Sequence, residues 1–435
     1  MFVIGPYLRM RRGGAEAQAD DHALRDFEAR LDEAAGLARA IDLDVVDSLI
    51  AQVNEIRPAT YLGKGKVDEI AGLVTAEMAE LVVMDCALSP IQQRNLEKAW
   101  NTKVLDRTGL ILEIFGRRAK TKEGALQVEL AHLNYQRSRL VRSWTHLERQ
   151  RGGFGFMGGP GETQIEADRR QIGERIVRLQ NELKKVQATR RLHRAGRQRV
   201  PYRVVALVGY TNAGKSTLFN RLTRADVQAA DMLFATLDPT LRAIHLPHGG
   251  KAMLSDTVGF ISNLPTQLVA AFRATLEEVL EADVILHVRD ISHEDAEAQQ
   301  RDVDAVLRQL GIDPDSGRIL EVWNKIDRFS PEEREKLANI AARRPGEHPC
   351  LLVSAATGEG VEALLAAIED RLAAACVTLD LSIDAADGAG ISWLHRNAEV
   401  LNKELHDGRF DMTVRVDETK RDIVVNRFDA VPQGI

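Results

Sequence analysis

The spacing of apolar residues changes several times along the chain, and each change indicates a new part of the fold. Over the first 115 residues, short apolar runs alternate with amphipathic stretches, which predicts β-strands that alternate with α-helices. Such alternation is typical of an α/β domain with a mainly parallel sheet. The expected strands are 43–53, 81–85 and 104–105, and the expected helices are 23–39, one that opens at the glycine turn 63–66, and 90–100.

Residues 116–198 carry a different pattern, in which apolar residues recur at a four–three spacing. Two such stripes can pack together as an antiparallel coiled coil, so we predict a hairpin of two helices, each of about 25 residues or about 37 Å. Thr163 and Glu166 have the spacing of a capping box, which places the start of the second helix just after Pro160 and Gly161. The stripes, interrupted once by Arg137, are Leu126, Leu130, Leu133, Leu140, Trp144 and Leu147, and then Ile172, Ile176, Leu179, Leu183 and Val186.

Two further parts follow the hairpin. Apolar runs in 199–375 each lead into a polar or glycine-containing motif, as in α/β nucleotide-binding domains. The remaining residues read as β-α-β-β, with a strand at 377–383, a helix at 391–405 and a hairpin of 412–416 with 423–428. The expected fold class is therefore multidomain α/β: an N-terminal α/β domain (1–115), a basic helical hairpin (116–198, tip 152–161), a larger α/β domain (199–375) and a small C-terminal α+β interaction domain (376–435).

A phosphate-binding motif opens the third part. Residues 209–216 read Gly-Tyr-Thr-Asn-Ala-Gly-Lys-Ser, a full match to G-x-x-x-x-G-K-[ST]. A strand-like run precedes the motif and a helix-like run follows it, which is the context that the motif requires. The glycines let backbone N–H groups point at the phosphates, Lys215 supplies charge, and Ser216 offers a hydroxyl to Mg²⁺.

Four further signals follow in the order that a GTP site requires. Residues 256–259 fit D-x-x-G, which contacts Mg²⁺ through its Asp and the γ-phosphate through its Gly amide. Residues 324–327 fit N-K-x-D, in which the carboxylate of Asp327 accepts two hydrogen bonds from guanine that adenine cannot donate. Residues 354–356 fit the loop that closes over the base. Residues 234–240 lie where a mobile switch supplies a Thr to Mg²⁺, and we take Thr236, with Thr240 as the alternative.

Together these motifs predict that 199–375 is a P-loop GTPase domain, which binds GTP with Mg²⁺ and hydrolyses GTP to GDP. The predicted catalytic residues are Lys215, Thr236 and Gly259, and the predicted metal ligands are Ser216, Thr236 and Asp256. The predicted nucleotide-binding residues are Gly209, Tyr210, Thr211, Asn212, Ala213, Gly214, Lys215, Ser216, Thr217, Phe234, Ala235, Thr236, Leu237, Asp238, Asp256, Thr257, Val258, Gly259, Asn324, Lys325, Ile326, Asp327, Ser354, Ala355 and Ala356.

Phe260 follows the D-x-x-G glycine, at the position where Ras-like enzymes carry the glutamine that orients the attacking water. A phenylalanine ring cannot orient water, so we expect slow hydrolysis by the protein alone and a large stimulation by a partner. Asn212 is a candidate for completing the site by holding a monovalent cation beside the phosphates. The alternative is that Asn212 only shapes the loop.

The composition is that of a globular protein long enough for two to four domains: 435 residues, 44% hydrophobic and 28% charged. No run approaches the roughly 18 apolar residues of a membrane helix, and residues 1–10 are too short for a signal peptide. Cys86, Cys350 and Cys376 lack metal-ligand spacing, which favours reduced thiols. We expect a cytoplasmic monomer, with peripheral membrane association as an alternative.

Positive charge is concentrated in one segment. Residues 117–203 hold 21 Lys/Arg against eight Asp/Glu, whereas the whole chain has a net charge of −6. This asymmetry predicts a polyanionic partner, the alternative being a solvated helical face.

The predicted hairpin tip has an unusual composition, because six of the 11 residues in 151–161 are glycine and three are Phe or Met. Flexible linkers avoid aromatic residues, whereas rings can stack on bases. We therefore predict an RNA-contacting tip, with a loop folded onto its own protein as the alternative. Its predicted contact residues are Arg151, Gly153, Phe154, Phe156 and Met157.

Four segments resemble the HflX family of translation-factor-related GTPases, and the resemblance covers nearly the whole chain. They are YLGKGK at 61–66, LDRTGLILEIF at 105–115, GPGETQ at 159–164 and GYTNAGKS at 209–216, and the third is more specific than the P-loop. The resemblance implies a cytoplasmic GTPase that binds the large ribosomal subunit and its rRNA and splits stalled ribosomes, notably under heat stress. It also implies that the arm enters near the peptidyl-transferase centre and that the ribosome stimulates hydrolysis. Family members are described as hydrolysing ATP too, which Asp327 gives no reason to expect here.

Two functions remain open at this point. One is a ribosome-splitting factor controlled by GTP. In this function GTP orders the switches, and hydrolysis releases the factor from the ribosome. The other is an assembly or regulatory GTPase that binds rRNA or a protein effector without splitting ribosomes. The intact nucleotide motifs disfavour a purely structural RNA-binding role.

Overall fold

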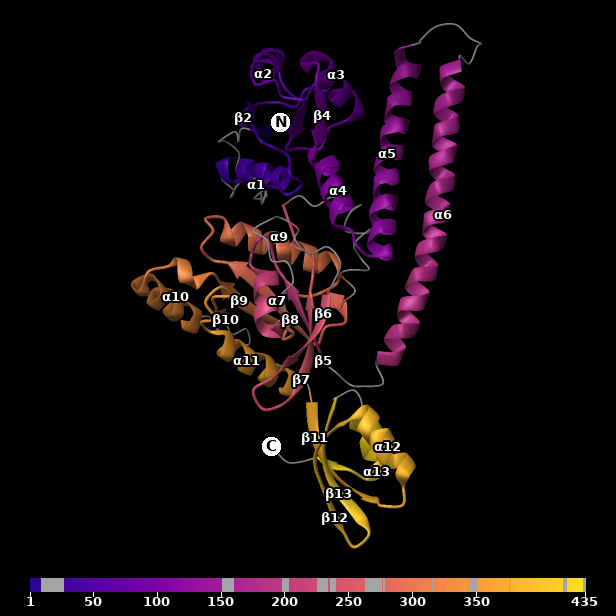
Figure 1. Ribbon diagram of the computed structural model, residues 1–435, viewed down its shortest axis with the longest axis vertical. Helices are drawn as coiled ribbons and strands as arrows, with labels where there is room; N and C mark the ends of the chain where they lie inside the picture. The colour runs from indigo at the N-terminus through magenta and orange to yellow at the C-terminus, as the bar shows by residue number, and fades with distance from the viewer. Residues whose placement is uncertain are drawn as a thin grey trace, which may run out of the picture.

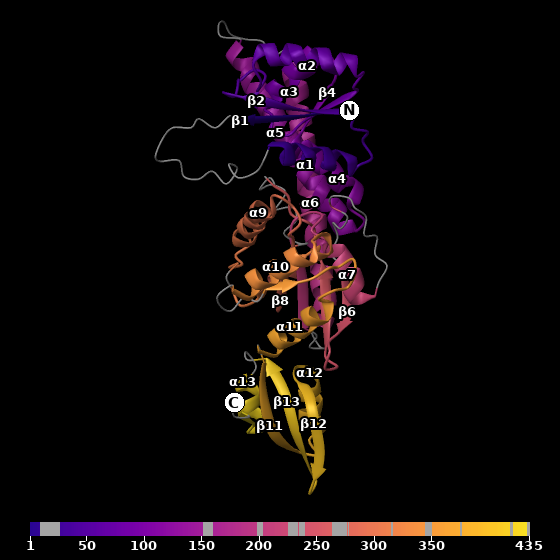
Figure 2. The ribbon, with the colours of Figure 1, turned by 90° about the vertical axis from the view of Figure 1, so that its left-hand side faces the viewer.

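The computed structural model arranges the chain as three globular parts stacked end to end, with a long helical hairpin beside the upper two (Figure 1). Figure 2 shows the same stack from the side, with α1 and α4 between the N-terminal sheet and the P-loop domain. Among the residues that the structure describes, no helix combines the length and the apolar character that crossing a membrane requires. The described residues are 1–8, 27–150, 160–197, 203–224, 234, 240–262, 276, 278–314, 316–343, 350–374, 376–417 and 421–432.

The N-terminal part is the expected parallel α/β domain, but it contains a strand that the sequence analysis missed. All pairs in the sheet are parallel, in the order β2-β1-β3-β4. The missed strand, β1, pairs with both β2 and β3 and buries six of its seven residues. Its Gly5-Pro6 pair is typical of a turn, and only pairing on both sides makes it a central strand. The strands are β1 (Phe2–Leu8), β2 (Asp47–Val53), β3 (Leu81–Met84) and β4 (Lys103–Asp106).

Four helices accompany this sheet. Ser89 and Gln92 form a capping box at the start of the third helix, in which the Ser89 side chain accepts from the Gln92 N–H and the Gln92 side chain accepts from the Ser89 N–H. Asp106 caps the fourth helix by accepting a hydrogen bond from the Gly109 N–H. The helices are α1 (Phe27–Arg39), α2 (Lys64–Ala76), α3 (Pro90–Trp100) and α4 (Arg107–Arg118).

The predicted helical hairpin is confirmed, and its helices are longer than expected. α5 (Lys122–Gln150) has 29 residues and α6 (Pro160–Arg197) has 38. Apolar positions of both stripes are buried between the helices near their base, and the ion pairs Arg175–Glu129 and Lys122–Glu182 flank them. Because α6 begins at Pro160, the capping box at Thr163 is wrong, since Thr163 lies inside the helix. Proline at the start of a helix loses no hydrogen bond, so Pro160 itself begins α6.

The third part is a six-stranded sheet in the order β10-β9-β8-β5-β7-β6, in which only β6 is antiparallel to its neighbour. Alternate residues of its central strand face opposite sides, so Ala206 and Val208 join one core while Val205 and Leu207 join another. One core includes α9, and the other includes α7 and α11. The elements are β5 (Arg203–Val208), α7 (Lys215–Thr223), β6 (Thr240–His245), β7 (Lys251–Asp256), β8 (Val284–Asp290), α9 (Ala296–Gln309), β9 (Ile319–Asn324), η2 (Ile326–Arg328), α10 (Pro331–Arg343), β10 (Cys350–Leu352) and α11 (Val361–Ala374).

The C-terminal part is the expected small α+β domain, with two elements assigned wrongly from the sequence. The helix expected over 391–405 ends at Asn397, and residues 399–406 form a strand; the strand expected at 423–428 is a helix. Asp407 and Gly408, both at positive φ, turn the hairpin between β12 and β13, and this Asp-Gly signal was missed. The sheet of this C-terminal part has the strand order β12-β13-β11-β14, and all its pairs are antiparallel. The elements are β11 (Cys376–Asp384), α12 (Gly388–Asn397), β12 (Glu399–His406), β13 (Arg409–Asp417), α13 (Arg421–Phe428) and β14 (Val431–Pro432).

Candidate nucleotide-binding site

The phosphate loop runs from the end of β5 to the start of α7, as the motif requires. Gly209 and Gly214 have φ values of 151° and 92°, which side chains rarely adopt. A Cβ at Gly209 would lie 2.1 Å from the Val288 carbonyl oxygen, and one at Gly214 would lie 2.2 Å from the Asn324 amide. The glycines are therefore needed both for backbone conformation and for the close approach of strands β8 and β9.

Lys215 is the first residue of α7 and is held inside the phosphate loop. Its ammonium donates hydrogen bonds to the carbonyl oxygens of Gly209 at 3.1 Å and Tyr210 at 2.7 Å. Burial lowers the pKa of Lys215 to about 8, with the Asp256 carboxylate acting in the opposite direction. The backbone of the phosphate loop therefore fixes the position of the Lys215 ammonium.

Two of the three predicted metal ligands lie next to each other. The Ser216 hydroxyl donates to Asp256 Oδ2 at 2.7 Å, and Asp256 is fully buried at the end of β7. A hydroxyl and a carboxylate oxygen are hard oxygen ligands of the kind that Mg²⁺ takes, so this donor set fits Mg²⁺. The third predicted ligand, Thr236, lies outside the described residues, together with Ala235, Leu237 and Asp238. The alternative, Thr240, is the first residue of β6.

The two base-recognition motifs are joined to the phosphate loop by one side chain. Asn324 donates through its amide to the Ala213 carbonyl at 2.8 Å and accepts from the Ala355 N–H at 2.9 Å. The Ser354 hydroxyl donates to Asp327 Oδ1 at 2.6 Å, which orients the carboxylate predicted to read guanine. The fold therefore brings these three motifs together, as the sequence predicted.

The remaining residues of the two base-recognition motifs lie in different environments. Lys325 forms an ion pair with Asp290 at 2.7 Å, and Ile326 is buried. Ala356 is exposed. The Lys325 pair fixes the start of η2, which carries Asp327.

Arg221 braces the base loop, and sequence reasoning missed it. From the last turn of α7, its guanidinium donates to the carbonyl of Ala355 at 2.8 Å and to that of Ala356. The contact joins residues 134 positions apart in the chain, so no local pattern signals it.

The D-x-x-G segment lies directly on the phosphate loop. The Phe260 N–H donates to the Gly209 carbonyl at 3.1 Å, and the Thr211 N–H donates to the Phe260 carbonyl at 2.7 Å. The Phe260 ring is 1% exposed and belongs to the core, so it has no access to a water beside the phosphates. Within the motif, the Thr257 hydroxyl bonds the Leu207 carbonyl, and Val258 is buried in the same core as Phe260.

Several predicted contact residues lie at the edges of the site. Asn212 is exposed and has a φ of 59°, and Thr217 is exposed at the start of α7. Phe234 is buried, and its ring lies edge-on to that of Phe115 in α4. The predicted tip residues Arg151, Gly153, Phe154, Phe156 and Met157 lie outside the described residues.

Comparison with protein families covers almost the whole chain. The matching families are described as "GTP-binding GTPase N-terminal" (28–116), "GTP-binding GTPase Middle Region" (118–197), "50S ribosome-binding GTPase" (204–325) and "HflX C-terminal domain" (339–433).

Full-length relatives agree with these matches. GTPase HflX of Magnetococcus marinus is 52% identical over 89% of this chain and 87% of its own length. GTPase HflX of Escherichia coli K12 is 43% identical over 91% of this chain and 90% of its own. A GTP-binding protein of Sulfolobus solfataricus, solved in complex with GDP, aligns with a TM-score of 0.44 at 23% identity, covering 85% of this chain and 97% of that one. The phosphate loop, the guanine motifs and this similarity along the chain together identify a GTP hydrolase that belongs to the HflX family.

Proposed function

We propose that the protein binds the large ribosomal subunit and splits stalled ribosomes under stress, with GTP binding ordering the switches and hydrolysis releasing the factor. The observation that carries this proposal is the basic hairpin of α5 and α6, which lies between the N-terminal domain and the GTPase domain in the chain and beside both in the fold (Figure 1). The description "50S ribosome-binding GTPase" for the family matched by residues 204–325 supports the choice of partner.

The proposed roles within the site follow from its geometry. Ser216, Asp256 and Thr236 would hold Mg²⁺, which supplies charge neutralisation at the phosphates. Lys215 and the Gly259 amide would lie on either side of the γ-phosphate, and Asp327 would accept hydrogen bonds from guanine. Asn212 would hold a monovalent cation beside the phosphates, and its exposed position at the loop is compatible with this role.

The charge of the hairpin supports an RNA partner. The middle of α6 presents a series of exposed basic side chains, of which Arg175 forms an ion pair with Glu129. A strongly basic helix beside an otherwise acidic protein attracts the phosphate backbone of nucleic acid. The exposed basic residues are Arg169, Arg170, Arg175, Arg178, Lys184 and Lys185.

The test is to mix the purified protein with intact ribosomes and a non-hydrolysable GTP analogue, and to separate the particles by sedimentation. We expect loss of intact ribosomes and a factor that stays with the large subunit, whereas GDP leaves ribosomes intact. Binding without dissociation would contradict splitting and favour an assembly or regulatory GTPase.

A deletion of 152–159 separates the role of the tip from that of the nucleotide site. We expect this variant to bind GTP as the unaltered protein does and to lose ribosome splitting. Lys215→Ala is the matched control, because it should lose GTP binding while the hairpin remains intact. Splitting by the deletion variant at the normal rate would show that the tip is not the working part.

A further inference from the structure

Arg334 links the two loops that carry the base-recognition motifs, and neither motif includes it. It lies in the first turn of α10. Its guanidinium donates hydrogen bonds to the carbonyl oxygens of Asp327 at 3.2 Å and Phe329 at 3.0 Å. It also forms an ion pair with Glu359 at 2.9 Å, on the loop that begins at Ser354. One side chain therefore holds both loops.

These contacts close a ring of interactions around Asp327. The Glu359 carbonyl accepts from the Ser354 N–H at 2.9 Å, and the Ser354 hydroxyl donates to Asp327 Oδ1 at 2.6 Å. Arg334 completes the ring between the Glu359 carboxylate and the Asp327 carbonyl. The same network therefore holds Asp327 at its main chain and at its side chain. We call Asp327, Arg334, Ser354 and Glu359 the bridging cluster.

The start of α10 fixes the turn from which the Arg334 side chain extends. Ser330 and Glu333 form a capping box there. The Ser330 N–H donates to Glu333 Oε2 at 2.9 Å, and the Glu333 N–H donates to the Ser330 hydroxyl at 3.4 Å. Pro331, the first residue of the helix, occupies a position that proline favours. The local sequence 330–334 therefore determines where Arg334 meets the two loops.

Helix α10 contributes little to the hydrophobic core, since none of its residues from Pro331 to Arg343 is fully buried. The exposed fractions of the Arg334 and Glu359 side chains are 33% and 51%. An ion pair that is open to water in this way contributes little to stability. We therefore expect replacement of Arg334 to change the positions of the loops more than the stability of the domain.

The base loop is also held from its other side. Arg221 of α7 donates to the carbonyl oxygens of Ala355 and Ala356. Because this contact does not involve Arg334, loss of Arg334 releases the tie between the base loop and Asp327 and leaves the loop attached to α7. The two arginines therefore have separate roles.

The orientation of the Asp327 carboxylate is important because guanine presents two donors side by side, the N1–H and the N2 amino group. A pair of parallel hydrogen bonds depends on orientation as well as on distance. A site whose groups are misplaced by about 1 Å loses much of its function. The Ser354 hydroxyl restricts rotation of the carboxylate, and Arg334 restricts movement of the backbone that carries it.

We propose that Arg334 is a positioning residue for guanine recognition, and that the bridging cluster keeps the Asp327 carboxylate aligned with the N1–H and the N2 amino group. Loss of Arg334 then leaves the phosphate loop intact and reduces the preference for guanine over hypoxanthine, a base that lacks the amino group. This inference rests on the role of Asp327 in reading guanine proposed above.

The test measures the dissociation constants of GDP and of inosine diphosphate for the full-length protein by calorimetry. For Arg334→Gln we expect the preference for GDP to fall about fivefold, because hydrogen bonds from a charged donor are strong and this donor is partly exposed. A merely structural role would weaken both nucleotides equally. An unchanged preference in the folded variant, with or without such weakening, overturns the proposal.

Arg334→Lys decides the question if Arg334→Gln fails to fold. Lysine keeps the positive charge near Glu359, but a single ammonium cannot replace the planar guanidinium that reaches three acceptors. The preference for GDP should therefore fall in the same direction. Full retention of the preference in Arg334→Lys would show that charge alone is sufficient and would overturn the role of the carbonyl contacts.

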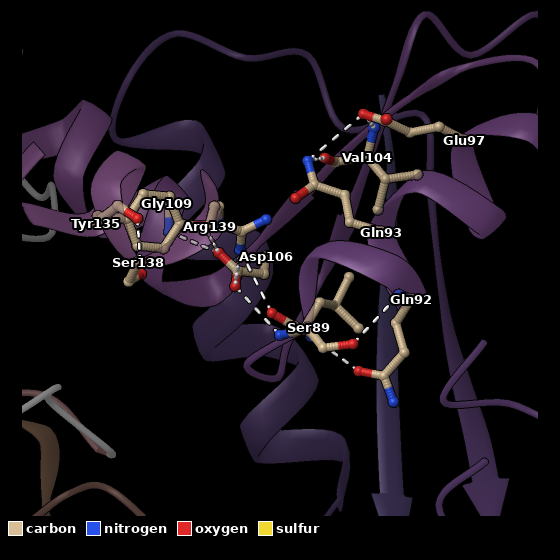
Figure 3. A network of polar contacts seen from close by, with 11 residues as sticks. Ser89, Gln92, Gln93, Glu97, Val104, Asp106, Gly109, Tyr135, Ser138 and Arg139 are labelled. Atoms are coloured by element: carbon tan, nitrogen blue, oxygen red, sulfur yellow. Dashed lines mark hydrogen bonds and ion pairs between the residues drawn. The ribbon is translucent and has the colours of Figure 1, made fainter. Parts of the chain in front are cut away.

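Two other arginines provide matched controls. Arg343→Gln removes a charge from the last turn of the same helix. Arg139→Gln removes an arginine that also joins two elements, because Arg139 of α5 bonds the Asp106 carboxylate at 2.6 Å, beside the Tyr135 hydroxyl at 2.5 Å (Figure 3). Both controls should keep the preference of the unaltered protein. An equal fall in either control would mean that the effect is not specific to Arg334, and would overturn the proposal.

Asp327→Asn separates this inference from the role on which it rests. If Asp327 reads guanine, this variant loses the preference for GDP over inosine diphosphate. Retention of the preference would reject the proposed role of Asp327 itself. Loss of the preference in Asp327→Asn together with its retention in Arg334→Gln would reject only the positioning role of Arg334.

Discussion

Lys215 illustrates how a single residue of the site is governed by its surroundings. Lys215 is 6% exposed, and its ammonium bonds two carbonyl oxygens of its own loop. Burial without a full counter-charge disfavours the charged form, which is why its pKa is lowered to about 8. A bound phosphate supplies the missing negative charge and therefore favours the ammonium.

This environment predicts a pH dependence of GTP affinity. Above about pH 8 the free protein loses the Lys215 proton that phosphate binding needs, so affinity should fall by up to about tenfold per pH unit. Below about pH 7 the lysine is charged in both states, and this contribution vanishes. The dissociation constant measured from pH 7 to pH 9 checks the sign. Lys215→Arg is the control, because arginine keeps its charge over this range, and equal slopes for the two proteins would contradict the assignment.

Asp327 leads to a second prediction about a single residue, which concerns the choice between guanine and xanthine nucleotides. Asp327→Asn replaces an acceptor by an amide donor, so GTP affinity should fall by about 2 kcal/mol, or about 30-fold, while xanthosine triphosphate gains. Competition binding with both nucleotides measures the change. Ser354→Ala removes only the hydrogen bond that orients the carboxylate and should weaken both nucleotides without reversing preference. An unchanged preference in Asp327→Asn would show that another group reads the base.

The elements differ in how far their own sequence determines them. The heptad stripes predicted α5 and α6, because a four–three repeat over many turns has few other solutions. The start of α6 was wrong by three residues, since Pro160 begins the helix ahead of the expected cap. The strand predicted at 423–428 is wrong, because these residues belong to helix α13. Ile423, Val424 and Val425 favour a strand by their residue type, but only Val424 of this helix is fully buried in the domain core.

Helix α6 gives a prediction at the element scale. Lys184→Gln with Lys185→Gln should weaken ribosome binding and reduce the slope of log affinity against log salt by about one for each phosphate that these lysines neutralise. GTP affinity should stay the same, because these exposed side chains lie on α6, outside the P-loop domain. Lys336→Gln with Arg343→Gln on α10 removes two exposed charges elsewhere and serves as the control. An equal loss of affinity from both pairs would mean that net charge, and not the arm, determines binding.

For the whole molecule, the main consequence of the fold is that the N-terminal domain, the hairpin and the GTPase domain share contacts at α4. The residues that make them, such as Arg107 and Ser262, are 155 positions apart. We therefore expect a partner that binds the hairpin to act on the nucleotide site through α4 without touching GTP.

This arrangement predicts partner-dependent hydrolysis. Because the Phe260 ring is buried in the core and cannot orient water, the isolated protein should hydrolyse GTP slowly, and ribosomes should raise kcat at least about tenfold. Phosphate release measured with and without ribosomes, in potassium and in sodium buffers, checks this and the proposed role of Asn212. Fast hydrolysis by the protein alone in sodium buffer would contradict both.

The sequence by itself predicted the nucleotide site, because phosphate and guanine recognition use short motifs whose residues are neighbours in the chain. It also determined the hairpin, whose repeat is local, and the family to which the chain belongs. Only the tertiary structure decided that 2–8 is a central strand, that 421–428 is a helix, and that Glu33, Arg107, Tyr210 and Ser262 meet at one point. These outcomes depend on contacts between residues far apart in the chain, which no local pattern of apolar and polar positions contains.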